Sequence, residues 1–395
     1  MPASPLRGRY LVRHPAWNAW LHTRDLLLSL TTPARRAIAT TTAGEIVERV
    51  LLAVGGHLGD AVIATSLLPQ IGRVFPGARV GVVTGSWNRQ VFEGHPQIDA
   101  IHAFDHWKLN RSAGSLLAHW SSMRRSSDAT VAAVRRIGYQ VGIDLSPYYP
   151  NASEILWRAG VPVRVGYRSG GGGPRYTHAL EWTAGRHVSE DHRVLLDVVR
   201  AGGADDTVPF YDLPAIPDAA VGSAERMMRA AGLADTPFVV AHTGAGATMK
   251  DWPAANWRVV AGALRDRGVR VVLTGHGAAQ RVATAALSQG TGAIDLCGQL
   301  EWAEFRWLLS RANAVLSVDT VAMHVAAAQR RPCIAIMTGV DDPARWRPLG
   351  DHTTVLTDRV PCAPCYRSHG CAAMSCIRGV STVAVLDAVA PYLPR

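Results

Sequence analysis

The sequence predicts an α/β protein made of two doubly wound domains, in which parallel strands alternate with helices. The chain has 395 residues and is 48% hydrophobic, so it is long enough for two domains that each bury a core. Short runs of Val, Ile and Leu alternate with helix-length segments, which is the pattern of a parallel sheet covered by helices on both faces. The pattern stops at the proline-rich segment 212–218 and then restarts, which places a linker between two similar halves.

Each half contains its own series of elements. In the first half we expect strands at 49–54, 79–83, 140–145 and 161–165, and a helix over 60–75. In the second half we expect strands at 238–241, 269–274, 314–318 and 333–337, and helices over 219–231, 254–267, 278–288, 302–311 and 322–330. The predicted domains are a basic extension over 1–44, an N-terminal Rossmann-like domain over 45–215, a C-terminal Rossmann-like domain over 216–380, and a final helix within 381–395.

Two segments of the first half have open interpretations. The extension combines arginines with Trp17, Trp20 and the leucines 26–28. Such a segment can lie in the headgroup layer of a membrane, or it can dock as a helix on its own protein, and the residues favour neither. The glycine-rich segment 169–174 is expected to be a mobile loop, either a lid or an insertion.

Composition narrows the class of partner. The 41 basic and 31 acidic residues give a net charge of +10, which suits an acidic ligand, an anionic membrane or nucleic acid. Only two of the basic residues are lysines, so the arginine content reflects genome composition, and no zinc-finger or RNA-binding signature supports nucleic acid. Six cysteines and no signal peptide predict a cytoplasmic protein, and no apolar run is long enough to span a bilayer, so any contact with the inner membrane is peripheral.

Two loops carry candidate chemistry for an anionic ligand. The strand 238–241 leads into a loop with Gly244, Gly246, Thr248 and Lys250, where small residues let backbone N–H groups approach a phosphate and the ammonium balances its charge. A surface turn is the alternative. The strand 314–318 is followed by Asp319, Thr320 and, one helical turn later, His324, which can face one pocket. Here the alternative is a helix cap and a buried histidine.

The first strand ends in a glycine turn that is followed by Asp60. The turn lacks the G-x-G-x-x-G spacing, and no acid ends the second strand, so a nicotinamide dinucleotide is disfavoured. Asp60 lies where ligands of doubly wound sheets bind, at the carboxyl end of a strand. The alternative is that Asp60 only caps the following helix.

Together these loops resemble glycosyltransferase family 9, typified by the ADP-heptose lipopolysaccharide heptosyltransferases. The resemblance covers about residues 48–390, and its motifs lie at 58–69, 250–257, 271–275, 317–328 and 342–350. It implies a GT-B fold, with two Rossmann-like domains facing a central cleft and the last helix crossing back to the first domain. It also implies inverting transfer of a heptose or related sugar from an ADP-sugar to a hydroxyl, in lipopolysaccharide core synthesis or a related pathway, with no metal required.

The resemblance also assigns residue roles. Asp60 becomes the general base on the acceptor hydroxyl and Lys250 the clamp on the donor diphosphate, which is coherent chemistry. Around the donor it places Thr248, Gly244 and Gly246 at the phosphates, Asp319, Thr320 and His324 at sugar and phosphate, Leu300 at the adenine and Gln280 at the ribose. Two residues depart from the family pattern: Gln280 replaces a glutamate, and Val321 replaces a glycine that tolerates φ > 0 better.

Four cysteines form a further cluster, at Cys362, Cys365, Cys371 and Cys376. Two pairs joined by a short loop can hold one structural Zn or Fe ion, and the resemblance extends to family members that hold iron here. Thiols without a metal, or a disulfide, are the alternative.

Several functions remain open on the residues alone. The acceptor is a glycolipid or another hydroxyl, including a protein hydroxyl in an O-heptosyltransferase. A GT-B transferase or epimerase that uses another nucleotide sugar is the rival enzyme. A sugar-nucleotide-binding assembly subunit without catalysis is the rival from another class.

Overall fold

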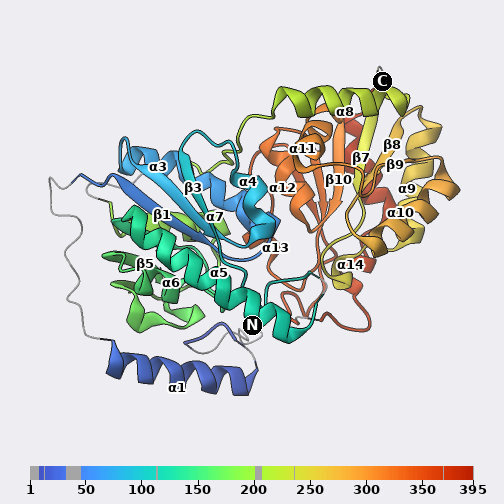
Figure 1. Cartoon of the computed structure of the whole chain (residues 1–395). Coiled ribbons are helices and arrows are strands. Elements are labelled where there is room, and N and C mark those ends of the chain that lie inside the picture. The colour runs from blue at the N-terminus through green and yellow to red at the C-terminus, as the bar shows by residue number, and fades with distance from the viewer. Residues whose placement is uncertain are drawn as a thin grey trace. The chain divides into compact units, whose positions relative to one another are not determined.

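Two six-stranded sheets, one in each half of the chain, carry the fold (Figure 1). The computed structural model describes residues 9–12, 14–32, 46–112, 114–200, 207–234, 236–367 and 369–394. The chain divides into two units after Pro214, at the predicted proline-rich joint. All strand pairs in both sheets are parallel, as the alternation of strands and helices predicts.

The first unit has the strand order β3-β2-β1-β4-β5-β6. Its strands are β1 (Arg49–Val54), β2 (Arg79–Thr84), β3 (Ile98–Ala103), β4 (Val141–Asp144), β5 (Val163–Tyr167) and β6 (His178–Leu180). Its helices are α1 (Pro15–Thr31), α2 (Leu58–Ala64), α3 (Leu68–Val74), α4 (Arg89–Phe92), α5 (Leu116–Ile137), α6 (Ser153–Arg158) and α7 (Val188–Asp197). Because β1 lies between β2 and β4, five of its six residues are buried, and the loop that follows β1 starts at the point where the strand order reverses.

The second unit has the strand order β12-β11-β10-β7-β8-β9. Its strands are β7 (Phe238–His242), β8 (Arg270–Thr274), β9 (Ile294–Asp295), β10 (Ala314–Val318), β11 (Cys333–Ile336) and β12 (Thr353–Leu356). Its helices are α8 (Asp218–Ala230), α9 (Ala254–Asp266), α10 (Ala278–Thr291), α11 (Trp302–Arg311), α12 (Val321–Ala328), α13 (Pro343–Trp346), α14 (Ser375–Arg378) and α15 (Thr382–Val389). The two central strands, β7 and β10, are buried along their whole length.

Two local expectations are wrong, each for a clear reason. The helix expected over 60–75 is divided into α2, a 3-10 turn and α3, because Pro69 in the first turn of α3 has no N–H to continue the ladder. The last helix, α15, contributes the buried Val385 and Val389 to the core of the second unit, where it packs on α9. Its crossing back to the first domain stays a prediction.

The glycine-rich segment is the second correction. It does not project as a mobile loop, because Ser169 and the glycines up to Gly173 are buried. The helix α1 packs on it: the Asp25 carboxylate accepts a hydrogen bond of 2.7 Å from the Gly172 N–H. The extension therefore docks, through its helix, on the chain's own first unit. In the part of the chain that the structure describes, no helix is long and apolar enough to cross a bilayer.

Candidate active site

The loop after β1 places Asp60 in the first turn of α2. Gly56 has φ +84°, and an added Cβ there would lie 2.4 Å from the Asp60 Oδ2 atom, so the turn requires glycine. The Asp60 carboxylate accepts a hydrogen bond of 2.8 Å from the His57 N–H, in a capping box. Asp60 is therefore a cap and is also partly exposed at the carboxyl end of the central strand, the location at which doubly wound sheets bind ligands.

Neighbouring loops hold this turn in place. The indole of Trp87 and the amide of Asn88 both donate to the Gly56 carbonyl, at 3.0 and 3.3 Å. On the other side, a small recess joins Gly55 and Gly56 to Asp144 and Asn151, at the ends of β1 and β4. The Asp60 turn thus borders a recess in the first unit.

Sequence patterns did not single out Asp144, which organises that recess. Its carboxylate accepts hydrogen bonds from the Ala152 N–H at 2.6 Å and the Tyr176 hydroxyl at 2.8 Å. Burial raises the pKa of Asp144 to about 6, although these donors and the Ser146 N–H oppose the shift. Asp144 therefore fixes the loop between β4 and α6. The one available signal was an acid at the end of a strand.

In the second unit the structure joins two of the predicted donor residues. The Lys250 Nζ atom lies 2.8 Å from the Asp319 Oδ2 atom, and the lysine side chain stays 26% exposed. Lys250 ends a 3-10 turn that begins at Thr248, after the loop with Gly244 and Gly246. Because β7 and β10 are neighbours, the loops that follow them meet at one edge of the sheet. Their pairing puts a partly exposed ammonium at the switch point of the second sheet, which is the place between β7 and β10 where the strand order reverses.

Gln280 fills the space between the loops that follow β7 and β8. Its amide oxygen accepts a hydrogen bond of 3.0 Å from the His276 N–H, and its amide nitrogen donates to the Ala245 carbonyl at 3.3 Å. A Cβ added to Gly244 would lie 2.6 Å from the Gln280 Cδ atom. Gln280 therefore holds the glycine-rich loop that ends at Lys250 in place. The sequence pattern did not predict this structural role.

The motif after β10 folds as an ordinary helix start. Thr320 is the N-cap of α12 and has extended backbone angles. Val321 is the first helical residue and is not among the described residues with positive φ, so valine in place of glycine causes no strain here. His324 is 3% exposed under the helix. The half-buried Leu300 follows β9, the strand beside β8, whereas Gln280 lies in the first turn of α10, which follows β8.

A buried histidine supports the base of this site. The His242 Nδ1 atom lies 2.9 Å from the Thr274 hydroxyl and joins the ends of β7 and β8. Burial lowers the pKa of His242 to about 4, so the ring is neutral at pH 7. The Asp251 carboxylate accepts a hydrogen bond of 3.3 Å from the Ala245 N–H, and burial raises its pKa. Both contacts hold the loop that carries Lys250.

The four clustered cysteines do not form a ligand set in this arrangement. None of the six cysteines is in a disulfide, and Cys362 is exposed whereas Cys376 is buried in the core of the second unit. The Cys371 Sγ atom accepts the Met374 N–H at 3.3 Å. Within the described ranges no three His, Cys, Asp or Glu side chains are grouped to hold a metal. The structural metal stays a prediction: about one equivalent of Zn or Fe by elemental analysis supports it, and a folded, metal-free protein rejects it.

Two doubly wound units, each with polar side chains after its central strands, define the class of two-domain α/β enzymes with the GT-B-like fold. Residues 130–373 match the model of glycosyltransferase family 9 (heptosyltransferase). The chain belongs to this family of glycosyltransferases.

Individual relatives agree with that assignment. Lipopolysaccharide heptosyltransferase 1 of Pseudomonas aeruginosa is 24% identical over 327 residues, which cover 81% of this chain and 86% of that protein. The solved structure of E. coli ADP-heptose lipopolysaccharide heptosyltransferase II has a TM-score of 0.68 at 18% identity and covers 87% of this chain and 98% of its own. An E. coli heptosyltransferase with ADP has a TM-score of 0.64 at 18% identity, with 87% and 100% covered. These structures are similar to the chain in fold.

Proposed function

We propose that the protein transfers a heptose from ADP-heptose to an acceptor hydroxyl, with inversion at the anomeric carbon. The single observation that carries the proposal is the partly exposed Lys250, paired with Asp319 on a glycine-rich loop at the switch point of the second sheet. Such a loop suits the diphosphate of a nucleotide sugar. The relatives named for ADP-heptose or for ADP supply the choice of donor.

In the proposed reaction the second unit holds the donor. The Lys250 ammonium turns from Asp319 to the diphosphate and balances the negative charge that grows as the anomeric C–O bond breaks. The Asp319 carboxylate is then released to accept hydrogen bonds from sugar hydroxyls. Gln280 contacts the ribose as an uncharged amide, and Leu300 contacts the adenine. ADP leaves as the product.

The first unit supplies the base. The Asp60 carboxylate takes the proton of the acceptor hydroxyl while the oxygen attacks the anomeric carbon, on the face opposite the leaving ADP. The new C–O bond forms as the bond to the diphosphate breaks, so the configuration inverts. The Asp60 carboxylate accepts the His57 N–H and is partly exposed, and each carboxylate oxygen can accept more than one hydrogen bond.

Asp60→Asn tests the catalytic assignment. The asparagine oxygen still accepts the His57 N–H, so we expect an intact helix start and unchanged ADP affinity by calorimetry. Turnover should fall at least about a hundredfold because the base is lost. The assay follows ADP release from ADP-heptose and the gain of one heptose by a deacylated lipopolysaccharide core lacking heptose. Retained turnover in the variant shows that another group is the base.

The acceptor is proposed to be a phosphorylated glycolipid of the lipopolysaccharide core, met at the cytoplasmic face of the inner membrane. On α1 the leucines 26, 27 and 30 are 62%, 57% and 76% exposed, which supports a peripheral contact with acyl chains. Cosedimentation with anionic vesicles tests it, and equal pelleting with and without vesicles refutes it. A protein hydroxyl as acceptor would appear as a mass gain on protein in place of glycan.

A further inference from the structure

A cavity of about 830 Å³ lies entirely in the first unit, and the function proposed above does not use it. Its walls are α1, α5, the loop after β3 and the loop between β4 and α6. Its size is that of a pocket for a small-molecule or saccharide ligand. His106 and Asn151 line both this cavity and the small recess at Gly55 and Gly56. The cavity thus adjoins the recess beside the glycine turn that precedes Asp60.

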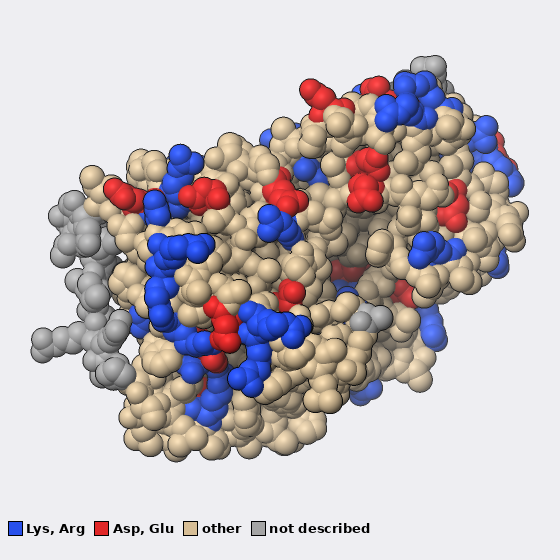
Figure 2. All heavy atoms as spheres, viewed as in Figure 1, with Lys and Arg blue, Asp and Glu red and all other residues tan. Residues whose placement is uncertain are grey.

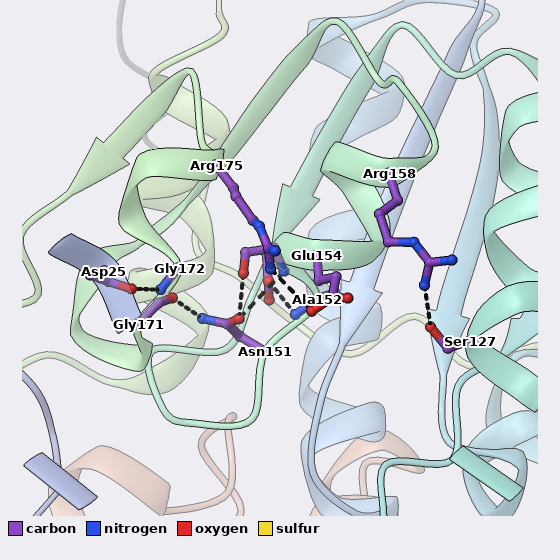
Figure 3. Close-up of polar contacts among 11 residues, drawn as sticks. Asp25, Ser127, Asn151, Ala152, Glu154, Arg158, Gly171, Gly172 and Arg175 are labelled. Carbon is purple, nitrogen blue, oxygen red and sulfur yellow. Dashed lines mark hydrogen bonds and ion pairs between the residues drawn. The ribbon is translucent and has the colours of Figure 1, made fainter. Parts of the chain in front are cut away.

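The helix α1 that forms one wall is built into the unit. Leu21 is fully buried, and an added Cβ on Gly171 would lie 2.6 Å from its Cδ2 atom. The buried Asp25 carboxylate accepts the Gly172 N–H at 2.7 Å and the Tyr10 hydroxyl at 2.9 Å. Figure 3 shows Asp25 reaching the glycine-rich loop, with Asn151 donating to the neighbouring Gly171 carbonyl. This helix precedes the family-matched residues 130–373.

Aromatic rings gather on the α1 side of the cavity. Trp17 and Trp20 are 5.3 Å apart in an edge-to-face pair, and both contact Tyr149, at 5.6 and 5.4 Å between ring centroids. Trp107 and Trp120 line the same cavity from the loop after β3 and from α5. Flat, amphipathic rings with polar edges suit the C–H faces and hydroxyls of a sugar. The lining therefore favours a saccharide over a purely apolar ligand.

The charges of the cavity do not cancel. Its two acids are paired: Asp128 with Arg158 at 2.7 Å, and Glu154 with Arg175 at 3.1 Å. Figure 3 shows Arg158 reaching Ser127 on α5 and Arg175 beside Glu154. Basic side chains also gather, with a few acids, over the face of the first unit that carries α5 and α6 (Figure 2). The two acidic side chains of the lining therefore do not neutralise the other basic side chains that line the cavity.

Two arginines remain without an acidic partner among the described residues. Arg24 and Arg124 stack on Trp20 and Trp120, at 5.5 and 5.1 Å from the ring centroids. The Arg24 Nη1 atom is buried and has no hydrogen-bond partner in the described structure, a costly state for a charged donor. The buried Nη1 atom faces the glycine-rich segment, 3.5 Å from a Cβ added to Gly171, so an anionic group in the cavity would pair with the other nitrogens of the Arg24 guanidinium, which lines the cavity.

We propose that this cavity is an acceptor subsite, built by the N-terminal helix, for a sugar unit that carries a phosphate or carboxylate. The sugar ring stacks among Trp17, Trp20 and Tyr149, and its anionic group pairs with Arg24. The inference rests on the proposed transferase function, because the bound unit belongs to the molecule whose hydroxyl reaches Asp60.

The test is a calorimetric titration of the full chain with glucose 6-phosphate, glucuronic acid, methyl glucoside and inorganic phosphate. At least one of the two anionic sugars should bind about tenfold more tightly than methyl glucoside and than phosphate alone. Which of them does so identifies phosphate or carboxylate as the natural group. Arg24→Gln should remove the preference for the anionic sugar but leave methyl glucoside unchanged. Trp20→Ala should weaken every sugar.

Matched controls come from the same unit. Arg125 is exposed on α5 beside Arg124 but does not line the cavity, and Trp157 pairs with Arg175 outside it. Arg125→Gln and Trp157→Ala should leave all affinities unchanged. A wild-type protein with no preference for an anionic sugar, a preference that survives Arg24→Gln, or sugar affinities that Trp20→Ala leaves unchanged overturns the subsite. ADP affinity is measured on the same samples: its presence beside an absent sugar preference refutes the subsite alone, and its absence in wild type refutes the proposed function.

Discussion

At the scale of single residues, the ion pair of Lys250 with Asp319 is the most informative contact. At 2.8 Å and with a partly exposed lysine, it holds the ammonium at the loop edge without burying it. Because both side chains are partly buried, desolvation offsets much of the attraction, and the net contribution of the pair to stability is small. The role of the ion pair is therefore to position the Lys250 ammonium where an anionic ligand can bind it.

Substitutions of the two partners should affect ADP binding differently. Lys250→Ala should weaken ADP about tenfold or more, since a charge-assisted hydrogen bond to phosphate is lost. Asp319→Asn should leave ADP affinity equal or tighter, because the ammonium is released and a repelling carboxylate is removed. Calorimetry with ADP measures both, with Arg265→Gln on the exposed face of α9 as the control. A loss of affinity in both variants would mean that the pair only holds the loop's shape.

Residue identity alone did not show which polar groups work together. The glycines, Thr248 and Lys250 were recognised as a phosphate loop, yet the brace that Gln280 provides at the Ala245 carbonyl depends on two loops far apart in sequence. Asp144 was missed for the same reason, because its partners Ala152 and Tyr176 lie on other elements. Asp60 can both cap α2 and act as the proposed base, since it accepts the capping hydrogen bond and is still partly exposed.

At the scale of elements, central strands were predictable and edge strands were not. The runs 49–54 and 314–318 coincide with β1 and β10, because a strand buried on both faces is continuously apolar. The strands β3, β6, β9 and β12 lie in the outer positions of the sheets and are half-buried, so they lack that signal. The helix α5 was also unassigned, since its exposed face is rich in arginine and serine.

The link between β7 and β8 gives a pH-dependent prediction. The folded pKa of His242, about 4, lies below its ordinary value of 6.5, so the folded state favours the neutral ring. Its stabilising contribution is full above pH 6.5 and is lost as the pH falls toward 4. Between pH 7 and 4.5 this amounts to about 2–3 kcal/mol.

Urea unfolding of wild type and His242→Asn across that range measures the effect. The asparagine keeps a polar group near Thr274 but does not titrate, so the free energy of unfolding of the variant should fall less steeply as pH decreases. His352→Asn, at an exposed histidine, should behave as wild type. Parallel curves for all three proteins would show that His242 does not set this pH dependence.

At the scale of the whole molecule, the two units supply different halves of one proposed reaction. The linker was predictable from prolines, and the division after Pro214 falls there. The destination of the last helix was not predictable, because its apolar residues fit either unit and only packing decides, here with the second core. The docking of α1 likewise depends on Asp25 meeting a loop 147 residues away.

The central claim is that the second unit binds the nucleotide of an ADP-sugar through Lys250. The most direct measurement is a calorimetric comparison of ADP, UDP and GDP on wild type and Lys250→Ala. We expect selective binding of ADP by wild type and about a tenfold or greater loss of affinity in the variant. A preference for UDP or GDP, or ADP binding that survives Lys250→Ala unchanged, would contradict it.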